Sequence, residues 1–205
     1  MLLAIDTSAG TSVAVVDLDA GILAEESVAD QRSHAEVIGT LIEAALRRAG
    51  VAPHELSGVV AGMGPGPFTG LRVGIAAARA FALGIARPVV PIVSHDAIAL
   101  GLERPSLIVT DARRREVAWS RYDAPDELGL PVRVAGPELA RPDDLETLIE
   151  GYSGLARIDA ATVSAGALGM LGERLYAAGR PFASPDALYL RAPDVTLSTP
   201  KRVTS

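Results

Sequence analysis

Three polar residues, Asp6, Thr7 and Ser8, form the first part of this sequence able to do chemistry, in a turn between two apolar runs. A carboxylate in such a turn can hold Mg²⁺ through water, and the hydroxyls and the Gly10 turn can donate to phosphate oxygens. The same residue types also make ordinary hairpin turns, in which an aspartate accepts nearby backbone N–H groups. The turn alone leaves a phosphate loop and a structural turn open.

A second candidate is the segment GPGPFTG, with Gly64, Gly66 and Gly70, which precedes a predicted helix. Free N–H groups and the helix dipole at such a position favour an anion. The segment lacks the lysine and the spacing of a Walker loop, and Arg72 is its nearest cation. A rigid connector that positions the next helix is therefore favoured over a phosphate-binding loop.

Residues for nucleophilic or metal-dependent catalysis are sparse. The chain has no cysteine and three histidines, in no HExxH or HxxxH arrangement, and it has no G-x-S-x-G elbow. His34 and His54 are expected to be solvated. His95 opens a short predicted helix and has Ala99 at the i+4 position. We expect no catalytic residue, no metal site and no cofactor.

The composition is that of a globular protein. Of 205 residues, 49% are hydrophobic and 21% are charged, and this composition is not that of a disordered chain. The net charge of -6 argues against a large basic surface for nucleic acid. The apolar run after Met1 is too short for a signal peptide, and no apolar stretch reaches about 18 residues. We expect a cytoplasmic protein with no membrane span.

The elements predicted before residue 104 are a three-strand meander followed by alternating helices and strands. The helix at 33–48 has the capping-box spacing of Ser33 and Glu36, and Gly50 ends it. This order fits the ribonuclease-H-like layout of actin-like ATPases, although periodicity leaves other α/β folds open. The strands are expected at 2–5, 12–18, 22–28, 59–63 and 88–93, and the helices at 33–48, 71–86 and 94–102.

The sequence becomes looser after residue 104, and we expect three regions: a first lobe at 1–104, a smaller second lobe at 105–190 and an extended or disordered tail at 191–205. No internal repeat is visible. The expected second-lobe elements are strands at 106–110, 116–122 and 161–164, an exposed connection at 125–142, and helices at 143–150 and 168–178.

The predicted helix at 71–86 is apolar nearly all round, so it must bury more than one face. Its sheet covers one side, and the helix at 33–48 is the obvious neighbour. The remaining apolar surface suits an oligomer interface, or else it is covered by the second half of the same chain. The predicted interface residues are Val37, Leu41, Arg72, Gly74, Ile75, Ala78, Arg79 and Ala82.

Three phrases together resemble the TsaB (YeaZ) family: IDTS from Ile5, GMGPGPFTGLRVG from Gly62, and DARRREVAW from Asp111. The resemblance extends to the late LYLR from Leu188. It implies an α/β, actin-like ATPase (ASKHA, ribonuclease-H-like) two-lobed fold with a reduced second lobe. The family is the partner subunit of TsaD in the synthesis of threonylcarbamoyladenosine at position 37 of tRNA.

The resemblance also implies an inactive relative of the catalytic subunit. TsaD carries a metal-binding His-x-x-x-His that aligns with His95 here, where the second histidine is Ala99. It also has a late glycine-rich phosphate loop, of which the segment from Ser164 to Gly169 keeps a trace. The two candidate loops above, containing Asp6 and Gly64, are then vestigial.

The implied partners are TsaD, in a heterodimer through the helices at 33–48 and 71–86, and the ATPase TsaE. The complex transfers the threonylcarbamoyl group to tRNA, which this subunit meets only through the complex, and a homodimer forms when the partner is absent. The alternative is a small actin-like ATPase or sugar-kinase-like enzyme that uses Asp6 and the 64–70 loop.

Overall fold

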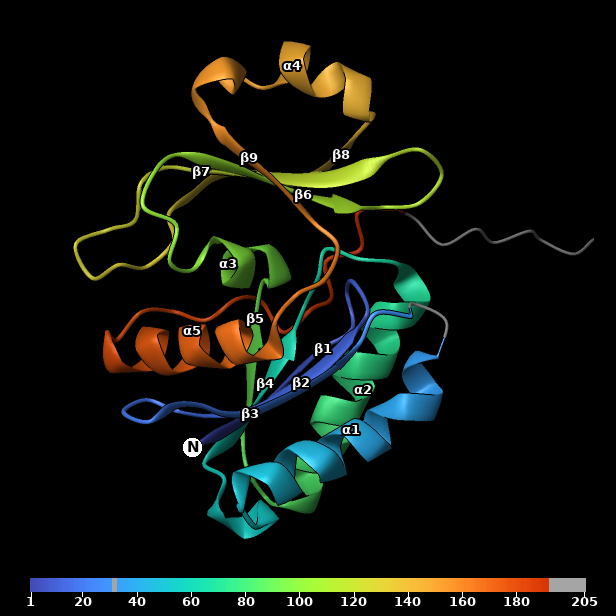
Figure 1. The fold of residues 1–205 in the computed structure, drawn as a ribbon, viewed down its shortest axis with the longest axis vertical. Coiled ribbons are helices and arrows are strands. Elements are labelled where there is room, and N and C mark those ends of the chain that lie inside the picture. Colours follow the sequence, from blue (N-terminus) through green and yellow to red (C-terminus); the bar gives the residue numbers. More distant parts are fainter. Residues whose placement is uncertain (31–32, 192–205) are drawn as a thin grey trace, which may run out of the picture.

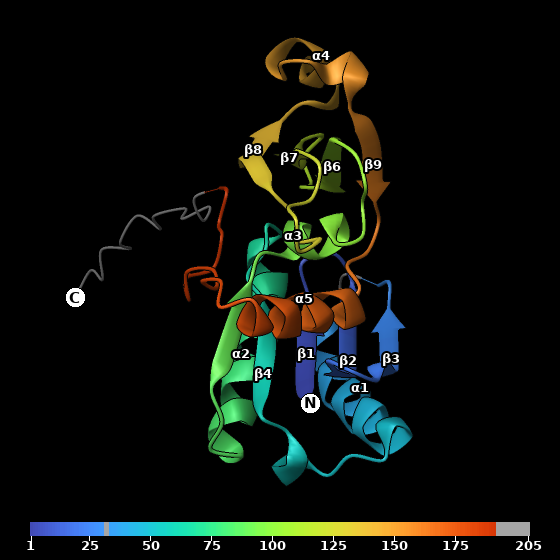
Figure 2. The ribbon, with the colours of Figure 1, turned by 90° about the vertical axis from the view of Figure 1, so that its left-hand side faces the viewer.

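The structure, a computed structural model, describes residues 1–30 and 33–191, so the tail expected at 191–205 lies outside the described residues except for Arg191. Two lobes lie one above the other, with α3 (Ser94–Ala99) between their sheets (Figures 1 and 2). The two sheets are formed by strands before and after residue 104 respectively.

The first sheet has five strands in the order β3-β2-β1-β4-β5. Three antiparallel strands form the predicted meander, and β1 pairs in parallel with β4, which pairs in parallel with β5. This mixed order is the ribonuclease-H-like arrangement. The strands are β1 (Leu2–Asp6), β2 (Thr11–Asp17), β3 (Gly21–Val28), β4 (Gly58–Gly62) and β5 (Val89–Ile92).

Helices cover both faces of the first sheet. On one face, α1 (His34–Ala49) and α2 (Phe68–Gly84) bury a core with Leu3, Ile5 and Val59. On the other face, α5 (Ala165–Ala177) packs across β1 and β2, as Figure 2 shows. Because β1 and β4 are covered on both sides, their sequences are continuous apolar runs rather than alternating ones.

The second sheet has the order β8-β7-β6-β9. Its β6, β7 and β8 form an antiparallel meander and β6 pairs in parallel with β9, so within the described residues it repeats the first four positions of the first sheet. This internal repeat was not visible in the sequence. The elements are β6 (Ser106–Asp111), β7 (Val117–Tyr122), β8 (Arg133–Ala140), α4 (Leu145–Leu148) and β9 (Ala156–Ala160).

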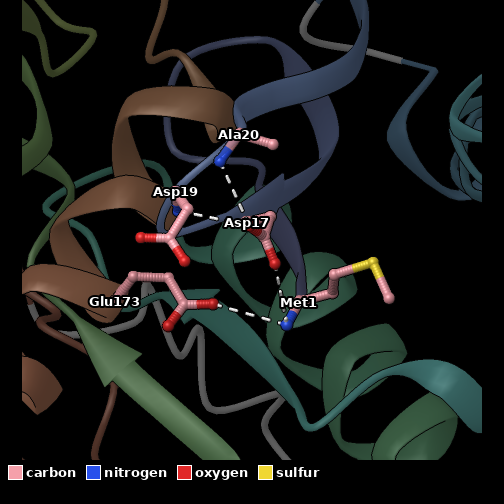
Figure 3. Close-up of polar contacts among 5 residues, drawn as sticks. All are labelled: Met1, Asp17, Asp19, Ala20 and Glu173. Carbon is pink, nitrogen blue, oxygen red and sulfur yellow. Dashed lines mark hydrogen bonds and ion pairs between the residues drawn. The ribbon is translucent and has the colours of Figure 1, made fainter.

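The region expected as a separate second lobe at 105–190 does not stay together, because α5 returns to the first sheet. Leu168 and Leu171 of α5 are buried with Ala4 and Val60 of the first sheet. The Met1 amino group lies 3.7 Å from Glu173 of α5 and 3.8 Å from Asp17 (Figure 3). The second lobe therefore ends near residue 160, and the following segment covers the first lobe.

Two strand predictions in the second lobe were wrong. The segment at 125–142, expected to be an exposed connection, contains the strand β8. Its Gly136-Pro137 pair interrupts the alternation of apolar and polar residues that is typical of a strand. A proline is tolerated there because β8 is an edge strand. The strand expected at 161–164 is instead β9, at 156–160. Its residues alternate between half-buried and exposed, and the charged residues Arg157 and Asp159 are of a type common in loops.

Several helix starts also differ from prediction: α4 begins at Leu145 and α5 at Ala165, where 143 and 168 were expected. Ser33 precedes α1 but its side chain makes no capping hydrogen bond, although Gly50 ends the helix in the left-handed conformation. Helix α2 begins at Phe68, three residues early, and includes Gly70. A Cβ at Gly70 would lie 2.7 Å from the Thr7 carbonyl oxygen, so this glycine marks a close contact rather than a loop. None of the helices in the described ranges combines the length and apolarity needed to span a bilayer.

Candidate functional site

The carboxylate of Asp6 lies at the end of β1 and is used entirely in contacts with its own chain. Its Oδ1 accepts hydrogen bonds from the Ser8 backbone N–H at 2.8 Å and the Ser8 hydroxyl at 2.5 Å. Its Oδ2 accepts from the Ser94 hydroxyl at 2.5 Å. Burial raises the pKa of Asp6, and the hydrogen bonds from Ser8 and Ser94 oppose that rise. Asp6 forms the structural turn, and it also ties β1 to α3.

The two candidate phosphate loops do come together, but they fill the space between them. The Thr7 hydroxyl donates to the Gly70 carbonyl at 2.7 Å and accepts from the Gly74 N–H at 3.1 Å. A Cβ at Gly66 would lie 2.7 Å from the Ser8 carbonyl oxygen. The glycines allow two backbones to touch, which favours the connector interpretation.

The late glycine-rich segment begins α5, and a carboxylate from β3 occupies its N-terminus. The Glu25 Oε1 accepts from the Gly166 N–H at 3.2 Å and from the Ser12 hydroxyl at 2.9 Å. The Ser164 hydroxyl donates to Glu25 Oε2 at 3.1 Å and caps the helix by accepting from the Ala167 N–H. A helix N-terminus favours an anion, and here Glu25 is that anion.

Sequence reasoning missed Glu25, which lies 139 residues from Ser164 in a predicted strand. No local pattern links an acidic strand residue to a distant helix start. A Cβ at Gly166 would lie 2.8 Å from Glu25 Oε2, so the glycine that resembled a phosphate loop makes room for the carboxylate. Ser94 was missed as a partner of Asp6 for the same reason, because the two residues lie 88 positions apart in the sequence.

The buried His95 joins the lobes instead of facing a metal. Its Nδ1 lies 2.8 Å from the Ser120 hydroxyl and its Nε2 lies 2.9 Å from the Thr110 hydroxyl, both on the second sheet. Burial lowers the pKa of His95 to about 3, so the ring is neutral at physiological pH. Ala99, at the expected second ligand position, is buried among apolar residues. The described residues contain no cluster of three metal-ligating side chains.

The other two histidines differ from each other. His54 is exposed, as predicted. The prediction that His34 is solvated was wrong, because it is buried between α1 and β2, with Nδ1 2.7 Å from the Thr11 hydroxyl. Burial lowers the pKa of His34. His34 was expected to be exposed because it lies in the first turn of a helix. Its contact with Gly70 of α2 cannot be predicted from the residues next to it in the sequence.

Residues 21–164 match a family model described as TsaD: tRNA N6-adenosine threonylcarbamoyltransferase. The chain belongs to this family. An uncharacterized protein of Mycobacterium leprae is 39% identical over 211 residues, which cover 95% of this chain and 55% of that protein. The Escherichia coli tRNA threonylcarbamoyladenosine biosynthesis protein TsaB is 33% identical over 104 residues, covering 48% of this chain and 45% of that protein. The chain thus spans about half the length of these relatives, and the predicted resemblance to TsaB is confirmed.

A solved structure shows the same fold. The crystal structure of an uncharacterized Pseudomonas aeruginosa protein with similarity to peptidase YEAZ superposes with a TM-score of 0.77 at 24% sequence identity. The match covers 93% of this chain and 99% of the other. The predicted two-lobed α/β fold is therefore confirmed.

The partner-interface residues predicted for this TsaB-like chain do not share one surface. Four of them face the first sheet and are buried, so their prediction as contact residues was wrong: Gly74, Ile75, Ala78 and Ala82. A helix that is apolar all round does not reveal which side faces the sheet. Gly74 faces inward because it leaves room for Thr7, whose Oγ1 would lie 2.2 Å from a Cβ at that position.

The remaining four predicted interface residues stay accessible to different degrees. Val37 and Leu41 are half-buried on α1. Arg72 is exposed and lies over the Phe68 ring, 4.0 Å from its centroid. Arg79 is exposed and donates to the Pro185 carbonyl at 2.6 Å. One flank of α2 is thus partly covered by residues 185–189 of the same chain.

Proposed function

We propose that this chain is the non-catalytic subunit of a tRNA threonylcarbamoyladenosine synthesis complex, in which it binds and supports TsaD. The observation that carries the proposal is that residues of the chain itself bind the Asp6 carboxylate and occupy the N-terminus of α5. The Asp6 carboxylate accepts hydrogen bonds from Ser8 and Ser94, and the Glu25 carboxylate occupies the N-terminus of α5. A subunit with these positions filled contributes to a reaction through a partner.

The surface proposed for the partner is the outer side of α2 with the adjoining α1. It is centred on Ala76, Ala80 and Leu83, which are exposed and spaced to share one helical face. Leu83 is 83% exposed, unusual for a large apolar side chain, and the alanines let another helix approach closely. The proposed surface also includes Val37 and Leu41, which are half-buried on α1, and we define the five residues as the α1–α2 face.

The proposed partner is TsaD, which the family model describes as the transferase. In this proposal TsaE joins the pair, tRNA is met only through the complex, and the complex acts in the cytoplasm. A second copy of the chain covers the α1–α2 face when TsaD is absent. The alternative of an ATPase or sugar-kinase-like enzyme finds no support at Asp6, which is buried and hydrogen-bonded on both oxygens.

Replacing Leu83 with aspartate is expected to weaken binding to TsaD at least 10-fold, because a charge would be buried in the apolar interface. The measurement is isothermal titration calorimetry with purified TsaD. Leu148→Asp is the matched control, since Leu148 is 60% exposed on α4 in the other lobe (Figure 1). Equal affinity of wild type and Leu83→Asp, with both proteins folded, would reject the α1–α2 face.

A further inference from the structure

A pocket lies beside α5, on the opposite face of the first sheet from α1 and α2. It has a volume of about 300 Å³ and is bounded by the end of β5, α3, the start of β8, the second half of α5 and the segment after α5. Figures 1 and 2 show α3 between α5 and the second sheet. Neither the Asp6 turn, the 64–70 loop nor Glu25 lines it, so the pocket is separate from the candidate phosphate loops.

Two residues of opposite charge line this pocket, Asp96 of α3 and Arg133 of β8. The Arg133 Nε lies 3.1 Å from the Asp96 Oδ1, which also accepts a hydrogen bond from the Tyr122 hydroxyl at 2.6 Å. This network joins α3 to the second sheet. Because its two charges cancel, the pocket as a whole favours neither a simple anion nor a simple cation.

The ion pair leaves hydrogen-bonding capacity unused. The Arg133 Nη1 donates to the Gly136 carbonyl at 3.2 Å, whereas no hydrogen bond within the described ranges involves the Arg133 Nη2 or the Asp96 Oδ2. The buried Arg133 Nε, although close to the carboxylate, also makes no aligned hydrogen bond there. The side chains of Arg133 and Asp96 are 28% and 23% exposed, so a ligand can reach both. The pocket therefore offers a charged donor and a charged acceptor side by side.

Apolar side chains form the rest of the pocket. Leu171 of α5 is buried, Leu175 is half-buried, and the Phe182 ring is 36% exposed. The segment that carries Phe182 is tied to the loop before β8 by an ion pair between Arg180 and Asp126, whose atoms lie 3.3 Å apart. An apolar pocket with a few polar groups on one side is the usual construction of a site for a small molecule.

We propose that this pocket binds a free α-amino acid with an aliphatic side chain. Its ammonium group donates to the Asp96 Oδ2 and its carboxylate accepts from the Arg133 Nη2, while its side chain lies against Leu175 and Phe182. An α-amino acid carries opposite charges on neighbouring groups, so it complements the ion pair and stays neutral overall. A ligand with a single charge gains one attraction and meets one repulsion.

The pocket volume suits one small molecule of this kind. The proposal goes beyond the role proposed with TsaD and does not depend on it, because the pocket contains no residue of the α1–α2 face.

The test is a two-dimensional NMR titration of the full, isotope-labelled chain with L-leucine and three analogues. 3-Methylbutylamine lacks the carboxylate of leucine, 4-methylpentanoate lacks its ammonium group, and glycine lacks its side chain. We expect L-leucine to bind with a Kd of about 1 mM or tighter, as suits a ligand of this size. Each analogue should bind at least 10-fold more weakly, because it loses a charged hydrogen bond or the apolar contact.

Arg133→Gln and Asp96→Asn are each expected to weaken L-leucine binding at least 10-fold, because each removes one charge of the pair. Both leave the other charge partly buried, so a third variant, Phe182→Ala, tests the pocket without disturbing the ion pair. It removes an exposed ring and should weaken binding about 3-fold or more. Arg157→Gln is the control, since Arg157 pairs with Asp159 on β9 outside the pocket, and it should bind L-leucine as wild type does.

Three results would overturn the proposal. The first is that a large excess of L-leucine shifts no resonance of the wild-type chain. The second is that an analogue with a single charge binds as tightly as L-leucine. The third is that Phe182→Ala and a folded Asp96→Asn protein both bind L-leucine with the wild-type affinity. Since TsaD is absent from these titrations, none of these results bears on the α1–α2 face.

Discussion

Gly62→Ala is expected to destabilise the chain by about 3 kcal/mol, because the added methyl group collides with a fixed carboxylate. A Cβ at Gly62 would lie 1.9 Å from Asp6 Oδ2 and 3.0 Å from the Ser94 hydroxyl oxygen. Asp6 cannot turn away without breaking its hydrogen bonds to Ser8 and Ser94 in a buried site. Natural domains have only about 5–15 kcal/mol of stability, so a loss of this size is large.

Urea unfolding followed by circular dichroism measures this effect, with Gly84→Ala as the matched control. A Cβ at Gly84 meets no atom within 4 Å, so alanine there should leave the stability unchanged or raise it by up to about 1 kcal/mol. Similar unfolding midpoints for wild type and Gly62→Ala would mean that the Asp6 carboxylate is not held as the structure has it.

His95→Asn is expected to cost about 2 kcal/mol at pH 7.5, because His95 links the lobes through two buried hydroxyls. Its ring nitrogens lie within hydrogen-bonding distance of Ser120 and Thr110, and the imidazole is fully buried. A smaller amide cannot reach both hydroxyls, so one buried polar group is left unsatisfied. The measurement is the urea midpoint of each protein, read at a far-UV wavelength.

The same pair of proteins tests the protonation state of His95. Its pKa falls from an ordinary 6.5 to about 3 in the folded chain, so the unfolded chain takes up the proton first as the pH drops. The stability contributed by neutral His95 is therefore complete above pH 6.5 and is lost towards pH 3, with a slope of up to about 1.4 kcal/mol per pH unit.

Asparagine does not titrate, so the advantage of wild type over His95→Asn should shrink as the pH is lowered from 7.5 to 4.5. The raised pKa values of Asp6 and Asp96 act in both proteins and cancel in the comparison. A constant difference across this range would show that His95 is already charged in the folded state, or is not buried.

Much of the first lobe was predictable because its elements follow local rules. Apolar runs bounded by Asp and Gly turns gave the three strands of the meander, and Gly50 ended α1 where the helical period stopped. The Asp6 turn was also foreseen as one of two interpretations. These features depend on residues close together in the sequence, which is the range over which periodicity and turn chemistry act.

The second lobe and the filling of the cleft were not predictable, because they depend on distant contacts. Pro137 argued against a strand at 133–140. A proline is tolerated there because β8 is an edge strand, and that position is known only from the sheet order. Glu25 reaches α5 across most of the chain, and the inward side of α2 is set by Thr7. A sequence pattern can suggest that a phosphate loop is degenerate, but the presence of the Glu25 carboxylate at the start of α5 is visible only in the fold.

We propose that the chain supports threonylcarbamoyl transfer through the α1–α2 face and that the Asp6 carboxylate has only a structural role. The direct test is the rate of threonylcarbamoyladenosine formation by reconstituted TsaD, TsaE and this chain, compared among wild type, Asp6→Asn and Leu83→Asp. Asp6→Asn, of nearly the same shape, should keep the rate within about 2-fold if it folds, while Leu83→Asp should lower it at least 10-fold. If a folded Asp6→Asn protein no longer supports threonylcarbamoyladenosine formation while Leu83→Asp supports it at the wild-type rate, the proposal is contradicted.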